Sequence, residues 1–379
     1  MVWASVLNTV YVPLIHSLTP QDGKVFTAEI TGMTLLLAGT LTLTLAIVLP
    51  HLITAFASDL DAEAAQSLRT AAAALAPVAG FGLLIAQLSV QLLAAERHAN
   101  TLYEVIPSLT LMLVILLLPS QGSISPLLIG TVLGIALQLL GLAHLLLRSR
   151  SLTRPVVRMS SKGWSNFRQA IGIMVFSQFV ISFNEPISNV IAAQLGEGNI
   201  SKLGYTTRIL ALFMGLGATS ISRAILPVLS SSSSSAKQRI RLALQWALLL
   251  LGGGILCTAL CWVLAPYIVR LLLERGAFTA EDTTSVVAAI RLGVYQFPFY
   301  FSGIVLVQLC ASFKLYKAIF ISSCIALFTK TLFSLILVKH LSYAGIVLAT
   351  TPMYFATAAF FFYFVLTRSH LFHEAAQKS

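Results

Sequence analysis

The chain has 379 residues, of which 57% are hydrophobic and 10% charged, and its mean hydropathy is +0.89. Soluble domains carry about a quarter charged residues, so this composition excludes an ordinary soluble protein. A bilayer-spanning helix needs about 20 apolar residues, so the length accommodates roughly ten such helices in one membrane domain. The net charge of +11 is then informative mainly through its distribution among the loops.

Apolar segments bounded by polar residues, proline or glycine predict about eleven transmembrane helices. In chain order these segments cover residues 2–18, 28–56, 68–95, 100–118, 124–147, 166–194, 201–229, 242–269, 284–313, 318–338 and 343–367. No cleavable signal peptide is expected, because the first segment is not preceded by a basic region. We therefore expect an all-α polytopic membrane protein.

The connections between these segments alternate in charge. One set carries 15 of the 24 basic residues, and the other carries five, together with the acidic loops at 59–63 and 281–282. Cytoplasmic loops of membrane proteins are enriched in lysine and arginine. The basic set, and with it the C-terminus, is therefore expected in the cytoplasm, and the N-terminus outside.

A basic segment divides the apolar segments into five before it and six after it. The two halves resemble each other weakly at an offset of about 215 residues, as in Val48-Leu-Pro50 and Leu264-Ala-Pro266. Parallel repeats of six helices are a known transporter design, with the substrate cavity between the halves. We expect two such lobes around a central cavity, the first without its first helix. The expected parts are an N-terminal lobe at 1–147, a basic cytoplasmic linker at 148–164, a C-terminal lobe at 165–367 and a cytoplasmic tail at 368–379.

Arginines inside the segments are candidates for substrate binding, because a charge in the hydrocarbon region costs about 2.5–3.5 kcal/mol and usually faces a cavity or a partner. Arg208 is the best candidate, since the planar guanidinium matches a phosphate. A structural ion pair is the alternative. For Arg223, anchoring at the membrane interface stays equally open, and for Arg291 a structural role stays open. Tyr205 suits a hydrophilic groove beside them.

Glu185 lies in the middle of a segment, beside Pro186. Proline removes a backbone hydrogen bond and leaves a free carbonyl near the carboxylate. This position suits a fixed ion pair, and the handling of a proton or cation is the alternative. Lys330 is the basic candidate for such a pair.

Several classes of activity are disfavoured by missing motifs. No GxxxxGK[ST] loop occurs, so the protein is not expected to use ATP. The four cysteines form no CxxC or Cys/His spacing, so no disulfide framework, metal site or cofactor is expected. The paired aspartates of metal-dependent transferases and the HExxH motif are also missing. We therefore expect a transporter and not an enzyme, with no nucleic-acid partner.

Two stretches of the chain resemble the MurJ (MviN) family. The first runs from Gln194-Leu-Gly-Glu-Gly-Asn-Ile-Ser201 through Tyr205-Thr-Thr-Arg208 to Leu226-Pro227-Val-Leu-Ser230, and it is similar to helices 7 and 8 of that family. The second, Arg275-Gly-Ala-Phe278-Thr-Ala-Glu-Asp282-Thr, is similar to the outer loop between its helices 9 and 10. Weaker similarity covers nearly the whole chain.

The resemblance implies the fold of the multidrug/oligosaccharidyl-lipid/polysaccharide exporter superfamily. It also implies a flippase that moves lipid II, the undecaprenyl-pyrophosphate-linked precursor of peptidoglycan, across the bacterial inner membrane by alternating access. Arg208 corresponds to the family's helix 8 arginine, a contact for the pyrophosphate. The expected partners are the lipid-linked anionic precursor and membrane lipids, and a monomer is expected. Compared with the family, the chain is expected to lack helix 1 and helices 13 and 14.

Some members of that family carry a sodium site built from helices 7, 11 and 12. At the corresponding places this sequence has Ser188, Lys330, Ser334 and Thr350. A lysine in place of a cation argues against sodium. The resulting hypothesis is that the Lys330 ammonium substitutes for the ion and is balanced by Glu185, one turn from Ser188.

Alternatives stay open. The substrate could be another lipid-linked polysaccharide unit, or a drug or cation in an antiporter of the same superfamily, although an antiporter would favour carboxylates in its cavity. From a different class, the chain could be a non-transporting remnant or a regulatory membrane partner.

Overall fold

A computed structural model describes residues 7–11, 14–15, 18–56, 62–94, 100–118, 124–148, 153–161, 163–230, 235–275 and 278–377. In these ranges the regular structure is helical and no strand occurs. The chain separates into two compact units, unit 1 (Met1–Ile171) and unit 2 (Gly172–Ser379). The all-α fold is as expected, and the lobe boundaries expected around 148–164 stay a prediction.

Eight helices in the described ranges are long and apolar enough to cross a membrane, and Ile106–Leu117 is a shorter apolar helix. The chain is therefore a multi-pass membrane protein. The expected count of eleven is not confirmed. Most of segment 2–18 lies outside the described residues, and segment 201–229 forms a long helix that is not among the eight.

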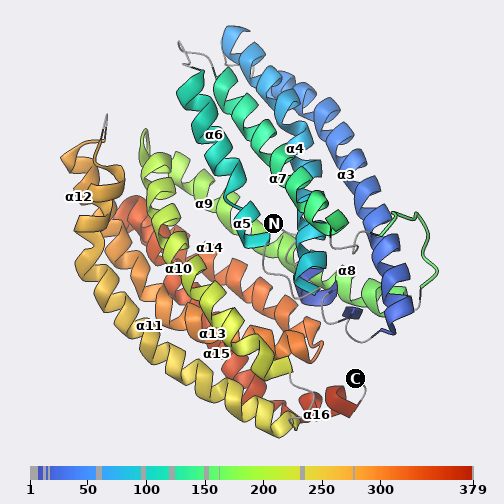
Figure 1. Ribbon diagram of the computed structural model, residues 1–379. Coiled ribbons are helices and arrows are strands. Elements are labelled where there is room, and N and C mark those ends of the chain that lie inside the picture. The colour runs from blue at the N-terminus through green and yellow to red at the C-terminus, as the bar shows by residue number, and fades with distance from the viewer. Residues whose placement is uncertain are drawn as a thin grey trace. The chain divides into compact units, whose positions relative to one another are not determined.

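Unit 1 is built on a long helical hairpin. Its elements are the π-helix η1 (Leu7–Tyr11), α3 (Pro20–Phe56), α4 (Ala62–Ala94), α5 (Asn100–Tyr103), α6 (Ile106–Leu117), α7 (Ser125–Arg148) and the first part of α8 (Gly163–Ser182). Helix α3 packs along α4, and α7 packs against both α4 and α6 (Figure 1). The close approach of α7 to α6 requires Gly134, because a Cβ atom there would overlap the backbone of Pro107.

The basic segment of unit 1 is tied to α3. The backbone N–H of Val156 donates to the carbonyl of Ala28 at 3.0 Å. The carboxylate of Glu29, which is 1% exposed, accepts hydrogen bonds from the N–H and hydroxyl of Ser160, the N–H of Ser161 and the indole of Trp164, at 2.6–3.2 Å. The described part of the linker, 153–161, is thus fixed along the start of α3.

Unit 2 continues with α9 (Asn184–Ala193), α10 (Asn199–Ser230), α11 (Ala236–Leu273), α12 (Ala280–Gly293), the 3-10 turn η2 (Val294–Gln296), α13 (Phe297–Ser312), α14 (Tyr316–Leu348), α15 (Thr350–Thr367) and α16 (Ser369–Gln377). Helix α11 packs along α13, and α10 contacts α12, α13 and α14. The core between them is continuous from Ile191 of α9 to Val347 of α14.

Helix α14 contains a sharp turn at Ser342, where φ is 51° and ψ is −141°. The turn separates the apolar segments expected at 318–338 and 343–367, so the expected break is present inside the long helix. The helical segment after Ser342 passes very close to the one before it, because a Cβ at Gly345 would overlap the carbonyl of Leu337.

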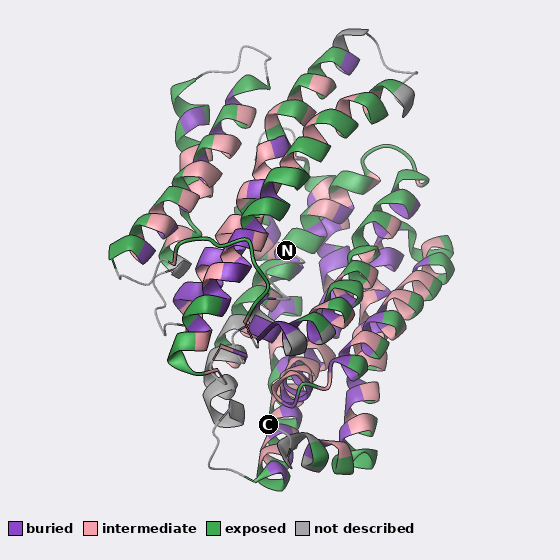
Figure 2. Cartoon of the chain, turned by 90° about the vertical axis from the view of Figure 1, so that its right-hand side faces the viewer, coloured by how far each residue is buried: buried purple, intermediate pink, exposed green. Residues whose placement is uncertain are grey.

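The outward faces of the long helices are apolar. On α11, Leu248, Ile255, Leu256 and Val263 are each 58–63% exposed, and Figure 2 shows exposed residues along the sides of many helices. Lipid chains would cover such faces in a bilayer, which is why a membrane protein does not bury them.

Candidate functional site

The site candidates on α9 are positioned by a break between α8 and α9. Helix α8 ends at Ser182 and α9 begins at Asn184, because Pro186 has no N–H to continue the backbone ladder. The side-chain amide of Asn184 donates to the carbonyl of Ile181 at 2.9 Å and so satisfies one of the carbonyl groups near the break. Glu185 lies directly after this break and is exposed.

Four of the proposed coupling residues lie on two helices in contact, since α9 packs against α14. The hydroxyl of Ser188 is buried and donates to the carbonyl of Asn184 at 2.6 Å. Ser334 is 1% exposed, and its hydroxyl has no hydrogen-bond partner in the described part of the chain. Lys330 is half-buried. The charge of Glu185 acts on Lys330 electrostatically. The two side chains are not among the ion pairs within 4.0 Å that the described residues form.

Thr350, the remaining coupling candidate, is the first residue of α15. Its hydroxyl donates at 2.6 Å to the carbonyl of Val347, in the last turn of α14. Among the described residues, no group of three or more His, Cys, Asp or Glu side chains forms a possible metal site.

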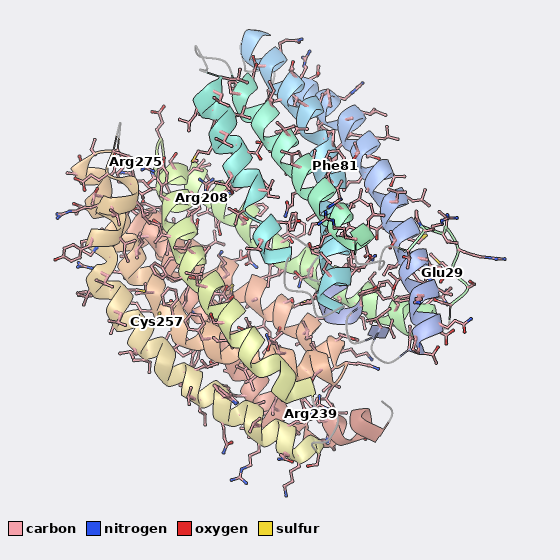
Figure 3. All side chains as sticks on the ribbon, in the orientation of Figure 1. Glu29, Phe81, Arg208, Arg239, Cys257 and Arg275 are labelled. Atoms are coloured by element: carbon pink, nitrogen blue, oxygen red, sulfur yellow. The ribbon has the colours of Figure 1, made fainter. Side chains whose placement is uncertain are left out.

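Arg208 lies in about the third turn of α10 and is exposed. Its side chain forms no hydrogen bond or ion pair with the residues that the structure describes, so the alternative of a structural ion pair finds no partner there. Tyr205, one turn earlier, packs edge-on against Phe278 with ring centroids 5.5 Å apart. Figure 3 shows Arg208 and Arg275 toward one end of unit 2 and Arg239 at the other.

Arg291 of α12 is engaged by a neighbouring helix. Its guanidinium lies over the ring of Trp262 at 4.2 Å from the centroid, and its Nε donates to the Trp262 carbonyl at 3.3 Å. A cation–π contact of this kind stabilises helix packing by about 0.5–2 kcal/mol. The geometry therefore favours the structural alternative for Arg291. Arg223 lies in α10, and its side chain is outside the described residues.

A cavity of about 490 Å³ lies where the start of α10 meets the end of α11. Its lining residues are Gly198, Ser201, Lys202, Tyr205, Leu272, Leu273, Arg275, Phe278 and Asp282. Inside it, the Lys202 ammonium lies 3.1 Å from the Asp282 carboxylate. Of these lining residues, the sequence predicts a site role only for Tyr205. It indicates loop positions for Lys202 and Arg275. A signal was nevertheless present, because both family-like stretches of the sequence converge here.

The chain is similar to one family over nearly its whole length. Residues 4–378 match the sequence profile of the family described as lipid II flippase MurJ. A "Probable lipid II flippase MurJ" of Helicobacter pylori is 32% identical over 170 residues, which are 44% of this chain and 36% of that protein. One of Buchnera aphidicola is 28% identical over 149 residues, 38% of this chain and 29% of that protein. The chain thus matches about a third of the length of these curated relatives.

Solved structures of the same fold cover essentially the whole chain. An inward closed conformation of lipid II flippase MurJ has a TM-score of 0.70 at 19% identity, covering 99% of this chain and 80% of that one. A transporter of the MOP superfamily from Pyrococcus furiosus has a TM-score of 0.76 at 15% identity, covering 100% and 86%. These likenesses identify the fold.

Proposed function

The chain belongs to the MurJ family of lipid II flippases, and on this basis we propose that it moves lipid II across the bacterial cytoplasmic membrane by alternating access. The observation that carries the proposal is the family match over residues 4–378. The multi-pass helical fold supports it, because a flippase must offer its substrate a path between helices. The charge asymmetry of the loops supports a cytoplasmic C-terminus. We further propose that the protein acts as a monomer and that its partners are the lipid-linked precursor and membrane lipids.

Arg208 is the residue to which we assign the pyrophosphate contact. An exposed arginine without a carboxylate partner among the described residues retains its full charge and all its hydrogen-bond donors for a ligand. Tyr205 lies on the same helix one turn away and offers a hydroxyl. Arg223, on the same helix, stays a candidate on the basis of the sequence alone. We keep Arg291 as a weaker candidate, because Trp262 already engages its guanidinium.

For coupling, we propose that the Lys330 ammonium acts as a tethered cation beside α9. The buried hydroxyl of Ser334, one turn from Lys330, has no described partner and offers an oxygen on the same helix. Glu185 supplies the opposing charge. A protein with a covalently attached cation would need no sodium at this place, and transport would then draw on another energy source.

Complementation of a bacterium depleted of its own lipid II flippase tests the proposed function. The wild-type chain should restore growth and cell shape. The variant Arg208→Ala should fail and Arg208→Lys should rescue partly, because lysine keeps the charge but loses the bidentate geometry. The matched control is Arg241→Ala, which removes an exposed arginine of α11 that has no hydrogen bond or ion pair within the described ranges.

Membrane expression of each variant must be equal for the comparison to hold. Rescue by Arg208→Ala equal to that by wild type would remove Arg208 from the site. Failure of the wild-type chain, together with drug-resistance or polysaccharide phenotypes on expression, would favour the other substrates of the superfamily. Failure with no phenotype at all would favour a non-transporting membrane partner.

A further inference from the structure

The cavity at the start of α10 contains one cation that its surroundings leave unpaired. Lys202 pairs with Asp282, whose other oxygen accepts hydrogen bonds from the hydroxyl and N–H of Thr279 at 2.9 and 3.2 Å. Arg270, just before the cavity in the chain, pairs with Glu274. The Arg275 guanidinium has neither an ion pair nor a hydrogen bond with the described residues. The lining therefore carries an excess positive charge, and all the donors of Arg275 are available to a ligand.

Further donors surround the same space. The hydroxyls of Ser201 and Tyr205 line it, and so does Gly198, which directly precedes the first residue of α10. Glycine has no side chain to cap the helix, so the first N–H groups of α10 are not covered by a capping side chain. These groups add to the preference for an anion that Arg275 already establishes.

The other side of the cavity is apolar and continues onto a lipid-facing surface. Leu272, Leu273 and Phe278 line the cavity. Next to it, Tyr267 and Leu271 are 66% and 82% exposed, and they lie on one face of α11 because they are four residues apart. A ligand that fits both sides has an anionic head and an apolar chain. A volume of about 490 Å³ lies within the range of small-molecule sites, about 300–1,000 Å³.

We propose that this cavity binds the phosphate of a membrane lipid, with Arg275 as its bidentate contact and the lipid chain along Tyr267 and Leu271. Two sources share this chemistry, a glycerophospholipid with an anionic headgroup and a polyprenyl phosphate. The charge asymmetry of the loops puts the cavity on the external side of the membrane. The site shares Tyr205 with the pyrophosphate contact assigned to Arg208 but is built around another cation, Arg275. Its occupation does not require transport, so lipid binding here is tested independently of the proposed function.

Lipid binding to the purified full chain tests the site. Detergent-solubilised protein is titrated with phosphatidylglycerol, with undecaprenyl phosphate, with uncharged diacylglycerol and with inorganic phosphate, and bound lipid is counted by native mass spectrometry. Wild type should bind one of the two lipid phosphates, and Arg275→Gln should weaken that binding about tenfold or more, as expected for a lost charge-assisted contact. The lipid that shows this dependence on Arg275 identifies the source.

The matched control is Arg270→Gln, which removes an equal charge five residues earlier in the chain but leaves the cavity lining intact. It should change the affinity less than twofold. Equal affinity of wild type and Arg275→Gln would overturn the proposal, as would equal binding of diacylglycerol. Inorganic phosphate that binds alone with the same dependence on Arg275 would overturn the lipid assignment. If Arg275→Gln does not fold, Arg275→Lys is compared with wild type instead. Lysine keeps the charge but loses the bidentate geometry of the guanidinium.

Discussion

Glu29 accepts a hydrogen bond from the indole nitrogen of Trp164 at 2.7 Å, across 135 residues of sequence. The same carboxylate receives three hydrogen bonds from Ser160 and Ser161, and the ring of Trp164 packs edge-on against Phe26 and Phe167 at 5.6 and 5.5 Å. One acidic side chain therefore holds the basic linker, the start of α3 and the start of α8 together.

Removing this carboxylate should release the linker. We expect Glu29→Ala to lower the free energy of unfolding by about 2–5 kcal/mol, because several donors lose a charged acceptor at a buried position. Thermal unfolding in detergent measures the loss, and tryptic cleavage after Arg158 should become several times faster. Glu104→Gln is the control, since Glu104 is exposed and has no described partner. Unchanged cleavage in Glu29→Ala would show that other contacts hold the segment.

Two glycines of α11 should respond in opposite directions. A Cβ at Gly254 would run into the backbone of Phe297 and Pro298 on α13, whereas a Cβ at Gly252 meets nothing within 4 Å. Gly254→Ala should therefore destabilise the protein by about 1–3 kcal/mol. Gly252→Ala should be neutral or raise stability by up to about 1 kcal/mol, because alanine favours the helix. Unfolding temperatures of the two variants compare them directly, and equal effects would contradict the close packing of α11 on α13.

Ser342 is a non-glycine residue at a φ of 51°. This backbone conformation is strained for a residue with a Cβ, at a cost of about 1–3 kcal/mol. We expect Ser342→Gly to raise the unfolding temperature and Ser342→Val to lower it, because valine is β-branched and tolerates positive φ poorly. An increase in stability with valine would mean that the turn does not constrain the chain in this way.

The tethered-cation proposal predicts indifference to sodium. Purified wild-type protein should unfold at the same temperature in sodium and potassium chloride at equal ionic strength. A specific site filled at 100 times its Kd would add about 2.7 kcal/mol of stability, which such a comparison detects easily. Sodium-specific stabilisation of the wild-type protein would contradict the proposal. If it persisted in Lys330→Met, the ion would bind without regard to the ammonium.

Helix positions were predictable from the sequence because each depends on local hydropathy. The break at Ser342 lies between the segments expected at 318–338 and 343–367. Segment 166–194 is expected as one span with a backbone hydrogen bond missing at Pro186, and in the structure two helices meet there. Partners distant in sequence were not predictable in this way. Nothing in the sequence near Glu29 indicates that its carboxylate accepts hydrogen bonds from Ser160, Ser161 and Trp164. Likewise, nothing near Lys202 indicates that it forms an ion pair with Asp282.

The site candidates show the same division. Arg208 was singled out because a charge in an apolar segment needs a reason, and it is exposed on α10. Arg291 satisfied the same criterion, yet its contact is the face of Trp262, a residue without charge that hydropathy cannot distinguish from any other apolar side chain. Arg275 escaped notice because a loop arginine usually has a purely solvent-exposed role, and only the cavity around it indicates a ligand.

Helix α11 has 38 residues and so measures about 57 Å along its axis, compared with about 30 Å for the hydrocarbon layer of a bilayer. Even a strong tilt leaves part of the helix in the headgroup region or the water, and its basic first turns, with Lys237, Arg239 and Arg241, are suited to that position. The protein therefore has hydrophobic length to spare. It should tolerate a thicker bilayer by changing tilt, whereas a thinner one would leave exposed leucines in contact with water.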